Sequence, residues 1–430
     1  MADIALPMPG LKTADGVPLK AALARANRGA QLRAFLLVAP LFAFILLTFA
    51  APIGQLLYRS VANSGFTTHV DFGTGVRTPI MVNVRDWFAA NPAGTEPDEA
   101  AFAALVADLR HGGEIRALGN VGTRINYDVS GARSLFTSAG RRAEDLAPPF
   151  RDALLGLDAD WARPDLWTAM REAAAAHTPN FYIAALDRKV DVDGSVTRVA
   201  PEQRIYVPLF WRTMLISAVI AGLCVLLGFP IAHLLATLPL RYSNLLMILV
   251  LLPFWTSLLV RTTSWMVLLQ SQGVVNNALV ASGIVADDNR IEMMYNQTGT
   301  IIAMTHILLP FMILPLYSVM RTIKPTYVRA ARSLGASSWT AFRRVYLPQT
   351  VPGVGAGVLL VFILAVGYYI TPALVGGASG QLFSNMIAFH MQKSLNWSLA
   401  AALAAMLLGA ILLLYWLYDR LIGIDNMKLG

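Results

Sequence analysis

Cysteine is almost absent from this 430-residue chain, and charged residues are scarce. Cys224 is the single cysteine and lies in an apolar run, so no internal disulfide can form. Only 14% of the residues are charged, against about 25% in a soluble domain, while 56% are hydrophobic. This composition indicates a polytopic membrane protein, and it excludes disulfide-stabilised scaffolds and cysteine-rich metal sites.

The motifs of common catalytic sites are also missing. The chain has no Gly-x-x-x-x-Gly-Lys-Ser/Thr loop to hold ATP phosphates and no His-Glu-x-x-His zinc motif. Its six histidines are scattered, and the acidic residues do not cluster with them. We therefore expect no catalytic residue, no metal site and no cofactor bound by this chain.

The net charge of +8 is unevenly distributed. Residues 60–205 hold 15 Lys/Arg and 19 Asp/Glu, a net charge of −4, so the remainder of the chain carries a net charge of +12. Positive charge that flanks apolar segments sets membrane topology. We therefore expect contact with membrane lipid and no nucleic-acid partner.

The N-terminal half of the chain predicts one membrane helix and one polar insert. Residues 1–33 are expected to form a cytoplasmic tail, and the charge-free stretch 34–58 is too long for a signal-peptide core, so it predicts an uncleaved first transmembrane helix. Residues 59–208 are soluble in character and long enough for their own core, which predicts an extracytoplasmic insert, possibly α+β. Amphipathic helices are expected at 98–110 and 165–176, and a hairpin or turn at 187–195.

The C-terminal half predicts five further spans, each long enough for a bilayer of about 30 Å. The connections between them alternate in charge, so the basic 321–348 loop and the 421–430 tail are expected in the cytoplasm, together with the N-terminus. The predicted fold is thus an all-α polytopic membrane protein with six transmembrane helices and an insert between the first two. The five spans are expected at 211–237, 244–269, 298–320, 350–371 and 395–418.

The 321–348 loop carries the most specific pattern in the chain. Pro325 is suited to open a short helix, Gly335 to end it, and Ser337 or Ser338 to cap a second one. Pro348 then ends the second helix or opens the next span. The loop is thus predicted to be two short helices with a break between them.

This loop resembles the cytoplasmic EAA loop of ABC-importer permeases. One residue differs from the family pattern: Arg329 stands where that family usually has Glu. An alternative interpretation is a basic loop that only faces anionic lipid. The residues that match the family pattern are Ala330, Ala331, Gly335, Val345 (in place of Ile), Leu347 and Pro348.

The resemblance extends over about residues 209–420 and is to spermidine/putrescine-type permeases. It is carried by three stretches at 252–276, 309–317 and 369–377. The resemblance implies two ATP-binding subunits that hold ATP and Mg, a second permease subunit that is a different chain, and an extracytoplasmic substrate-binding protein. It also implies a location in a bacterial inner membrane and import of a polyamine or a related small organic solute, with ATPase coupling through residues 329–348.

Polar and aromatic residues in the spans are candidates for the substrate path. Arg261 is either an intramembrane partner or gate, or a side chain that snorkels to the headgroups. His306 has no acidic neighbour at helical spacing, which favours a neutral, hydrogen-bonded core group. The other candidates, which are also explained by interface packing or helix capping, are Trp255, Trp265, Asn276, Tyr368 and Tyr369.

Two other classes of protein compete with the importer subunit. A secondary carrier or channel would need no ATPase, but the spans lack the acidic residues that couple protons or sodium ions. A membrane-anchored sensor would use the insert to bind its ligand, but it would not need five further spans. The loop pattern favours the importer subunit over both.

Overall fold

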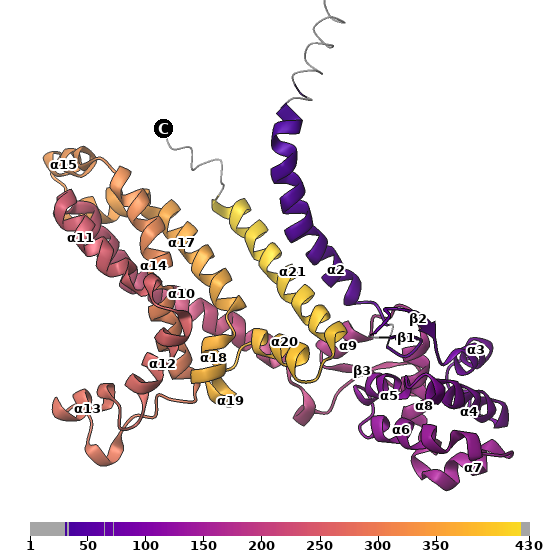
Figure 1. The fold of residues 1–430 in the computed structure, drawn as a ribbon. Helices are drawn as coiled ribbons and strands as arrows, with labels where there is room; N and C mark the ends of the chain where they lie inside the picture. The colour runs from indigo at the N-terminus through magenta and orange to yellow at the C-terminus, as the bar shows by residue number, and fades with distance from the viewer. Residues whose placement is uncertain (1–30, 32–33, 64, 72, 423–430) are drawn as a thin grey trace, which may run out of the picture. The chain divides into compact units, whose positions relative to one another are not determined.

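The computed structural model describes Gln31 and residues 34–63, 65–71 and 73–422 (Figure 1). The predicted 1–33 tail, apart from Gln31, and residues 423–430 lie outside the described residues. The chain divides into two units, Met1–Tyr58 and Arg59–Gly430, and each is described by itself.

From residue 34 on, the first unit is one long apolar helix, whose last residue, Arg59, begins the second unit. It spans Ala34–Arg59, with a π-helical turn η1 (Leu46–Ala50) followed by α2 (Ala51–Arg59). At 1.5 Å per residue, its 26 residues reach about 39 Å, which exceeds the hydrocarbon thickness of a bilayer. Neither η1 nor α2 has a buried residue, and Leu37 is 83% exposed, as a lipid-facing helix requires.

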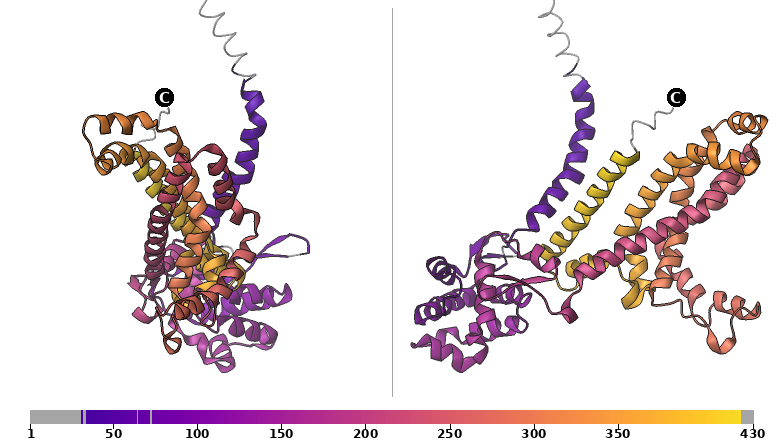
Figure 2. Two further views of the ribbon diagram at one scale, coloured as in Figure 1. Left: turned by 90° about the vertical axis from the view of Figure 1, so that its left-hand side faces the viewer. Right: turned by 180° about the vertical axis from the view of Figure 1, so that it is seen from behind.

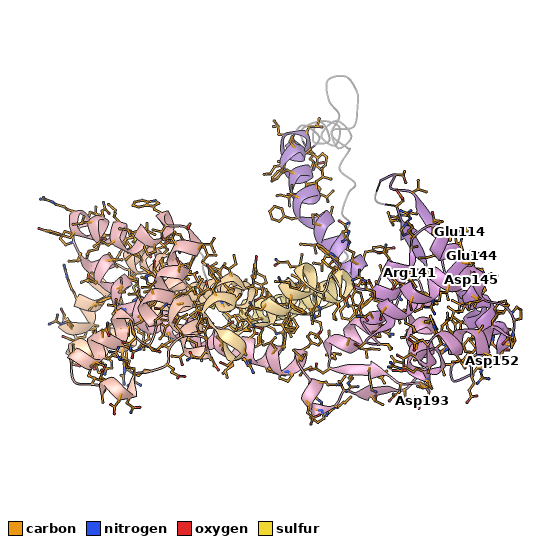
Figure 3. The ribbon with its side chains drawn as sticks, turned by 60° about the horizontal axis from the view of Figure 1, so that its bottom comes forward. Glu114, Arg141, Glu144, Asp145, Asp152 and Asp193 are labelled. Carbon is orange, nitrogen blue, oxygen red and sulfur yellow. The ribbon has the colours of Figure 1, made fainter. Side chains whose placement is uncertain are left out.

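The second unit begins with the insert, which we define as residues 60–205. It is mostly helical and carries two antiparallel hairpins, β1 with β2 and β3 with β4. Figure 3 shows labelled acidic side chains and Arg141 on this part of the chain. The elements are β1 (Thr68–Val70), β2 (Arg77–Pro79), α3 (Val82–Ala90), α4 (Glu99–Glu114), α5 (Leu118–Asn126), α6 (Ala132–Arg142), η2 (Ala143–Asp145), α7 (Phe150–Leu157), η3 (Ala159–Ala162), α8 (Pro164–Ala174), α9 (Asn180–Ala185), β3 (Arg188–Val190), β4 (Val196–Arg198) and η4 (Pro201–Gln203).

The insert has its own hydrophobic core. Phe102 of α4, Phe136 of α6 and Trp161 of η3 are almost fully buried in one cluster. The two predicted amphipathic runs are helices, since Asp98 caps α4 by accepting a hydrogen bond from Ala101 N and Pro164 opens α8. The hairpin predicted at 187–195 is also confirmed, as β3 and β4.

A buried carboxylate fixes the start of α3. Asp108 on α4 is 2% exposed and accepts hydrogen bonds from the backbone N–H groups of Asn83 (3.2 Å) and Val84 (2.8 Å). Desolvation raises the pKa of Asp108, and those hydrogen bonds oppose the shift only in part. The Asp108 side chain acts as the cap of α3, because the side chain of Met81, the residue before this helix, makes no capping hydrogen bond.

Long apolar helices form the rest of the second unit. The helices α10, α14 and α17 pack against one another around a buried apolar cluster, and they lie side by side in Figures 1 and 2. The elements are α10 (Tyr206–Thr237), α11 (Leu240–Leu251), η5 (Leu252–Trp255), α12 (Leu258–Leu269), α13 (Val274–Ala281), η6 (Asp287–Asn289), α14 (Gln297–Thr322), α15 (Pro325–Ser333), α16 (Ser338–Ala341), η7 (Phe342–Tyr346), α17 (Leu347–Gly367), α18 (Ile370–Val375), α19 (Gly377–Gly380), α20 (Phe383–Gln392) and α21 (Trp397–Ile422).

The span predicted at 244–269 is broken by a bend that the sequence analysis did not predict. Leu240–Trp255 and Leu258–Ala281 meet at an angle of 96°. Pro253 lacks an N–H for the helix ladder, and Ser257 caps a new helix by accepting a hydrogen bond from Val260 N (3.2 Å). The described residues contain five helices long and apolar enough to cross a membrane, or six if this bent pair is one span.

One carboxylate joins the insert to the first helix of the membrane part. Asp187 is 6% exposed and accepts hydrogen bonds from the N–H groups of Ile205 (3.0 Å), Tyr206 (3.0 Å) and Val207 (2.7 Å). These donors belong to the start of α10, where no residue of α10 accepts them. Asp187 thus caps the helix from 18 residues upstream.

We predict that Asp187→Ala destabilises this junction. The change leaves three N–H groups without their acceptor and places alanine at a φ of 54°, so we expect a loss of about 1–3 kcal/mol in stability. Hydrogen exchange at residues 205–207 and thermal unfolding of the purified protein measure it. Asp193→Ala, at the exposed tip of the same hairpin, is the control. Equal protection of residues 205–207 in both variants would contradict the role of Asp187.

We predict a pH-dependent effect of Asp108→Asn. Because the folded-state pKa of Asp108 is raised, this group contributes stability at low pH and loses that contribution as the pH rises through the folded pKa. The stability of the wild type relative to the variant should therefore increase as the pH falls from the raised folded pKa toward the ordinary value of 3.8. Thermal unfolding followed by tryptophan fluorescence at several pH values tests this. A difference that shrinks as the pH falls would contradict the assignment.

Candidate functional sites: the basic loop and a polar cluster in the membrane helices

The basic loop has the local structure that its sequence predicts. Pro325 opens α15, and Gly335 follows this helix at a φ of 92°, in the left-handed region that favours glycine. Ser337 then caps α16 by accepting a hydrogen bond from Thr340 N (3.2 Å). Pro348 was expected either to end the second helix or to open the next span. The structure supports the next span, because Pro348 lies in the first turn of α17 and the chain is helical throughout Ser338–Gly367.

The outer surface of this loop is largely exposed. Helix α15 has no buried residue; Arg329 and Ala330 are exposed, and Ala331 is half-buried. Leu334 is 89% exposed and Trp339 is 67% exposed, which is unusual for large apolar side chains. Gly335 also faces open space, because a Cβ built there would meet no atom within 4 Å.

The inner side of the loop is tied to α10 by stacked aromatic rings. Trp339 stacks on Phe342 (5.8 Å between centroids), and Phe342 stacks on Tyr346 (5.7 Å). The Tyr346 hydroxyl then lies 3.0 Å from His233 Nδ1, on α10. The matching residues Val345, half-buried in η7, and Leu347 lie beside this stack. These ring contacts therefore link the loop directly to α10.

Four of the predicted path residues are brought near one another in the membrane part. Trp265 Nε1 donates a hydrogen bond to His306 Nδ1 (3.0 Å), and the two rings meet edge to face (5.2 Å). An indole N–H can only donate, so His306 Nδ1 is the unprotonated nitrogen. Arg261 lies within electrostatic range of both His306 and Tyr368.

Arg261 differs from its predicted environment. It makes no ion pair among the residues that the structure describes, and its buried Nε has no hydrogen-bond partner there. The structural ion pair considered for Arg261 is therefore not found. His306 is hydrogen-bonded as predicted, but it is exposed rather than buried in a core.

Among the described residues, the remaining candidates make no side-chain hydrogen bond or ring contact with this cluster. Trp255 is 76% exposed, and Tyr369 is 38% exposed. Asn276 is buried and bonded to the backbone: its side-chain nitrogen donates to Gln270 O (3.2 Å) and Ile291 O (2.9 Å), and its oxygen accepts from Ile291 N (3.0 Å). Its side chain therefore holds the 270–297 segment together.

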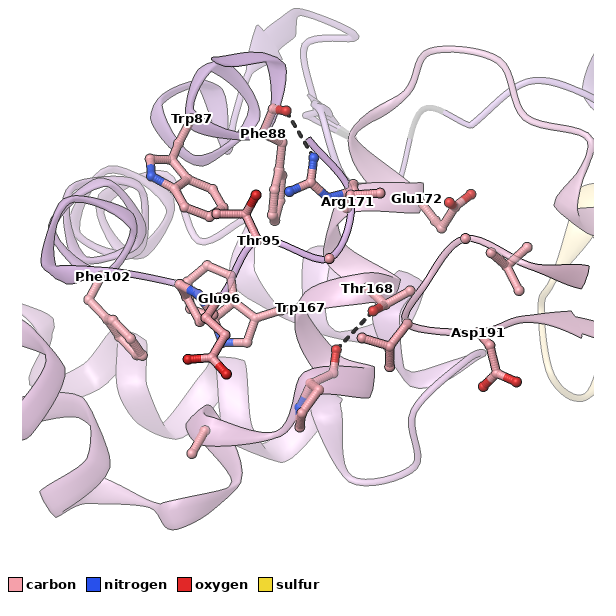
Figure 4. Close-up of a pocket in the computed structure, with 18 of the residues that line it drawn as sticks. Trp87, Phe88, Thr95, Glu96, Phe102, Trp167, Thr168, Arg171, Glu172 and Asp191 are labelled. Carbon is pink, nitrogen blue, oxygen red and sulfur yellow. Dashed lines mark hydrogen bonds between the residues drawn. The ribbon is translucent and has the colours of Figure 1, made fainter. Parts of the chain in front are cut away.

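Sequence reasoning missed a cleft in the insert, shown in Figure 4. Its volume is about 230 Å³, and aromatic rings of α3, α4 and α8 line it together with residues 93–97 and the β3–β4 hairpin. The only sequence signal was the presence of Trp87 and Trp167 in a soluble segment. Those two rings meet edge to face at 6.1 Å.

These features define a polytopic helical membrane protein with an exposed basic loop between two of its spans. Residues 205–422 match the family described as binding-protein-dependent transport system inner membrane component, and the chain belongs to this family. It is therefore a multi-pass inner-membrane protein and a transport component that works with a binding protein. The match begins where the insert ends.

Two spermidine/putrescine permeases agree with the family match. The spermidine/putrescine transport system permease protein PotB of Escherichia coli K12 is 38% identical over 227 residues, covering 51% of this chain and 82% of that protein. PotB of Haemophilus influenzae is 36% identical over 224 residues, covering 52% and 78%. A bacterial alginate ABC transporter in complex with alginate pentasaccharide-bound periplasmic protein aligns at a TM-score of 0.41 and 20% identity, covering 53% and 82%.

We predict that Trp265→Phe changes solute selectivity or apparent affinity more than Trp255→Phe does. The first change removes the hydrogen bond to His306, worth about 0.5–1.5 kcal/mol, beside the buried charge of Arg261. The second change alters an exposed ring outside the cluster. Uptake kinetics of the two variants, at matched expression, measure the effect. Equal kinetics for both would remove the cluster from the path.

Proposed function

We propose that this chain is the permease subunit of an ATP-driven importer for a polyamine or a related small organic solute. Its partners would be two ATP-binding subunits, which carry ATP and Mg, a second, different permease subunit, and the binding protein. The insert would lie outside the membrane, and both termini and the 321–348 loop would lie in the cytoplasm. The PotB relatives support the solute class, and the charge of the loops supports the orientation.

The observation that carries the coupling proposal is the two-sided construction of the loop. Its outer side presents exposed Leu334 and the Ala330–Ala331 surface, as a docking surface for another protein does. Its inner side continues through the aromatic stack to His233 on α10. Closure of the ATP-binding subunits would push on the outer side, and the stack would pass this motion to the spans.

Copurification tests the composition of the complex. The protein is extracted gently from its native membrane, and the accompanying proteins are identified by mass spectrometry. We expect an ATP-binding subunit and a second, similar permease. A chain that purifies alone, stable and monodisperse, would overturn the proposal in favour of a carrier that needs no ATPase.

We predict that Gly335→Trp uncouples ATP hydrolysis from uptake. The bulky side chain lies at the docking surface, so we expect uptake to fall at least about tenfold while the complex still assembles, since a misplaced contact of this kind has effects of that size. ATPase activity and uptake are measured on the same reconstituted complex.

Gly283→Trp is a matched control for this experiment. Gly283 also has positive φ (74°) and open space around it, so the substitution imposes the same kind of backbone strain in a different segment. Normal coupled transport by Gly335→Trp, or an equal loss in both variants, would count against a specific coupling role of the loop.

A further inference from the structure

The cleft in the insert lies where three elements meet. Helices α3 and α8 contribute Trp87, Phe88 and Trp167, and residues 93–97 form a second wall. The tip of the β3–β4 hairpin closes a third side. Because Trp167 is 5% exposed and Phe102 beneath it is 1% exposed, the aromatic floor is held rigidly by the core of the insert.

Arg171 stands at one end of this cleft with an incomplete set of partners. Its Nη1 donates to Phe88 O (3.0 Å) and Asn91 O (2.6 Å), and its guanidinium lies over the Phe88 ring (4.8 Å to the centroid), as Figure 4 shows in part. Among the described residues, Nε and Nη2 have no hydrogen bond, and Arg171 has no ion pair. Partial burial also lowers the pKa of Arg171, and the nearby Glu172 carboxylate offsets this desolvation only in part.

The acidic residues around the cleft are mostly occupied. Asp191 accepts a hydrogen bond from Thr197 Oγ1 (2.9 Å) and pairs with Lys189 (3.4 Å). Glu172 accepts a hydrogen bond from Asn180. Glu96 lines the cleft but is exposed to solvent. Two of the aromatic rings that could attract an ammonium ligand, Trp87 and Phe88, already have the Arg171 guanidinium over them.

We propose that this cleft binds a small organic carboxylate with a flat apolar body, anchored by Arg171. The two free donors of the guanidinium, Nε and Nη2, are adjacent, and together they suit the two oxygens of a carboxylate. The tryptophan rings and Pro97 and Pro164 would cover the apolar body. The volume of about 230 Å³ is below the roughly 300–1,000 Å³ of drug-sized pockets, which limits the ligand to about one ring.

This site is separate from the path of the transported solute, and the proposal of a carboxylate ligand does not depend on the proposed function. The cleft is built wholly from insert residues, outside the 205–422 family match. A carboxylate side chain of a docking protein would present the same chemistry. The enclosed aromatic floor and the small volume favour a free small molecule.

Titration calorimetry of the full-length protein in a neutral detergent tests the proposal with benzoate as the probe. We expect saturable binding of benzoate, and binding weaker by about tenfold or more for benzamide and benzylamine, which keep the ring but lack the carboxylate. Arg171→Met keeps the apolar stem and should reduce benzoate affinity by a similar factor. Failure of benzoate to bind, or stronger binding of benzylamine, would overturn the proposal.

A second pair of variants keeps the test valid if Arg171→Met fails to fold. Ala93 lines the cleft and is exposed, so Ala93→Trp should block benzoate without touching the arginine. Ala89 is exposed on α3 but does not line the cleft, so Ala89→Trp is the matched control and should bind normally. Unchanged binding by Ala93→Trp would place the ligand elsewhere and overturn the assignment. A protein that binds acidic peptides but not benzoate would also overturn it.

Discussion

The start of α10 depends on one carboxylate that is not part of the helix. A helix that enters the membrane part must have its first N–H groups satisfied, because an unpaired buried donor costs about 1–3 kcal/mol. Asp187 satisfies three of them at once. Hydrogen bonds therefore join the last part of the insert to α10, the first helix of the 205–422 family region. The two parts form one unit and are not separate domains joined by a linker.

Further contacts extend this junction to the last helix. Phe181 and Ala185 of α9 pack into the same cluster as Leu399 and Leu403 of α21. Buried Arg124 supports α9 from the other side, since its guanidinium lies over the Phe181 ring (5.3 Å). The insert thus rests on both α10 and α21, and displacement of α9 would strain each of them.

The sequence predicted features that depend on local chemistry or on apolar length. The first apolar helix, the hairpin at 187–195 and the Pro325–Gly335–Ser337 pattern of the loop were of this kind. Features that depend on distant residues were not predictable. The caps by Asp108 and Asp187 join separate elements, and the cleft joins α3, α8 and β3–β4. The bend after Pro253 was missed because an apolar run of sufficient length favours a straight span even where a proline and a serine cap interrupt it.

Helix α10 is the element that both functional regions share. Asp187 fixes its first turn, and His233, in its last turns, meets Tyr346 at the end of the aromatic stack. A helix transmits displacement along its axis because each turn is hydrogen-bonded to the next. The insert and the basic loop are therefore connected through one continuous helix of 32 residues, in which Pro230 removes one backbone hydrogen bond shortly before His233. Any change that loosens the cap at Asp187 would lower the stiffness of this connection without altering a residue of the loop itself.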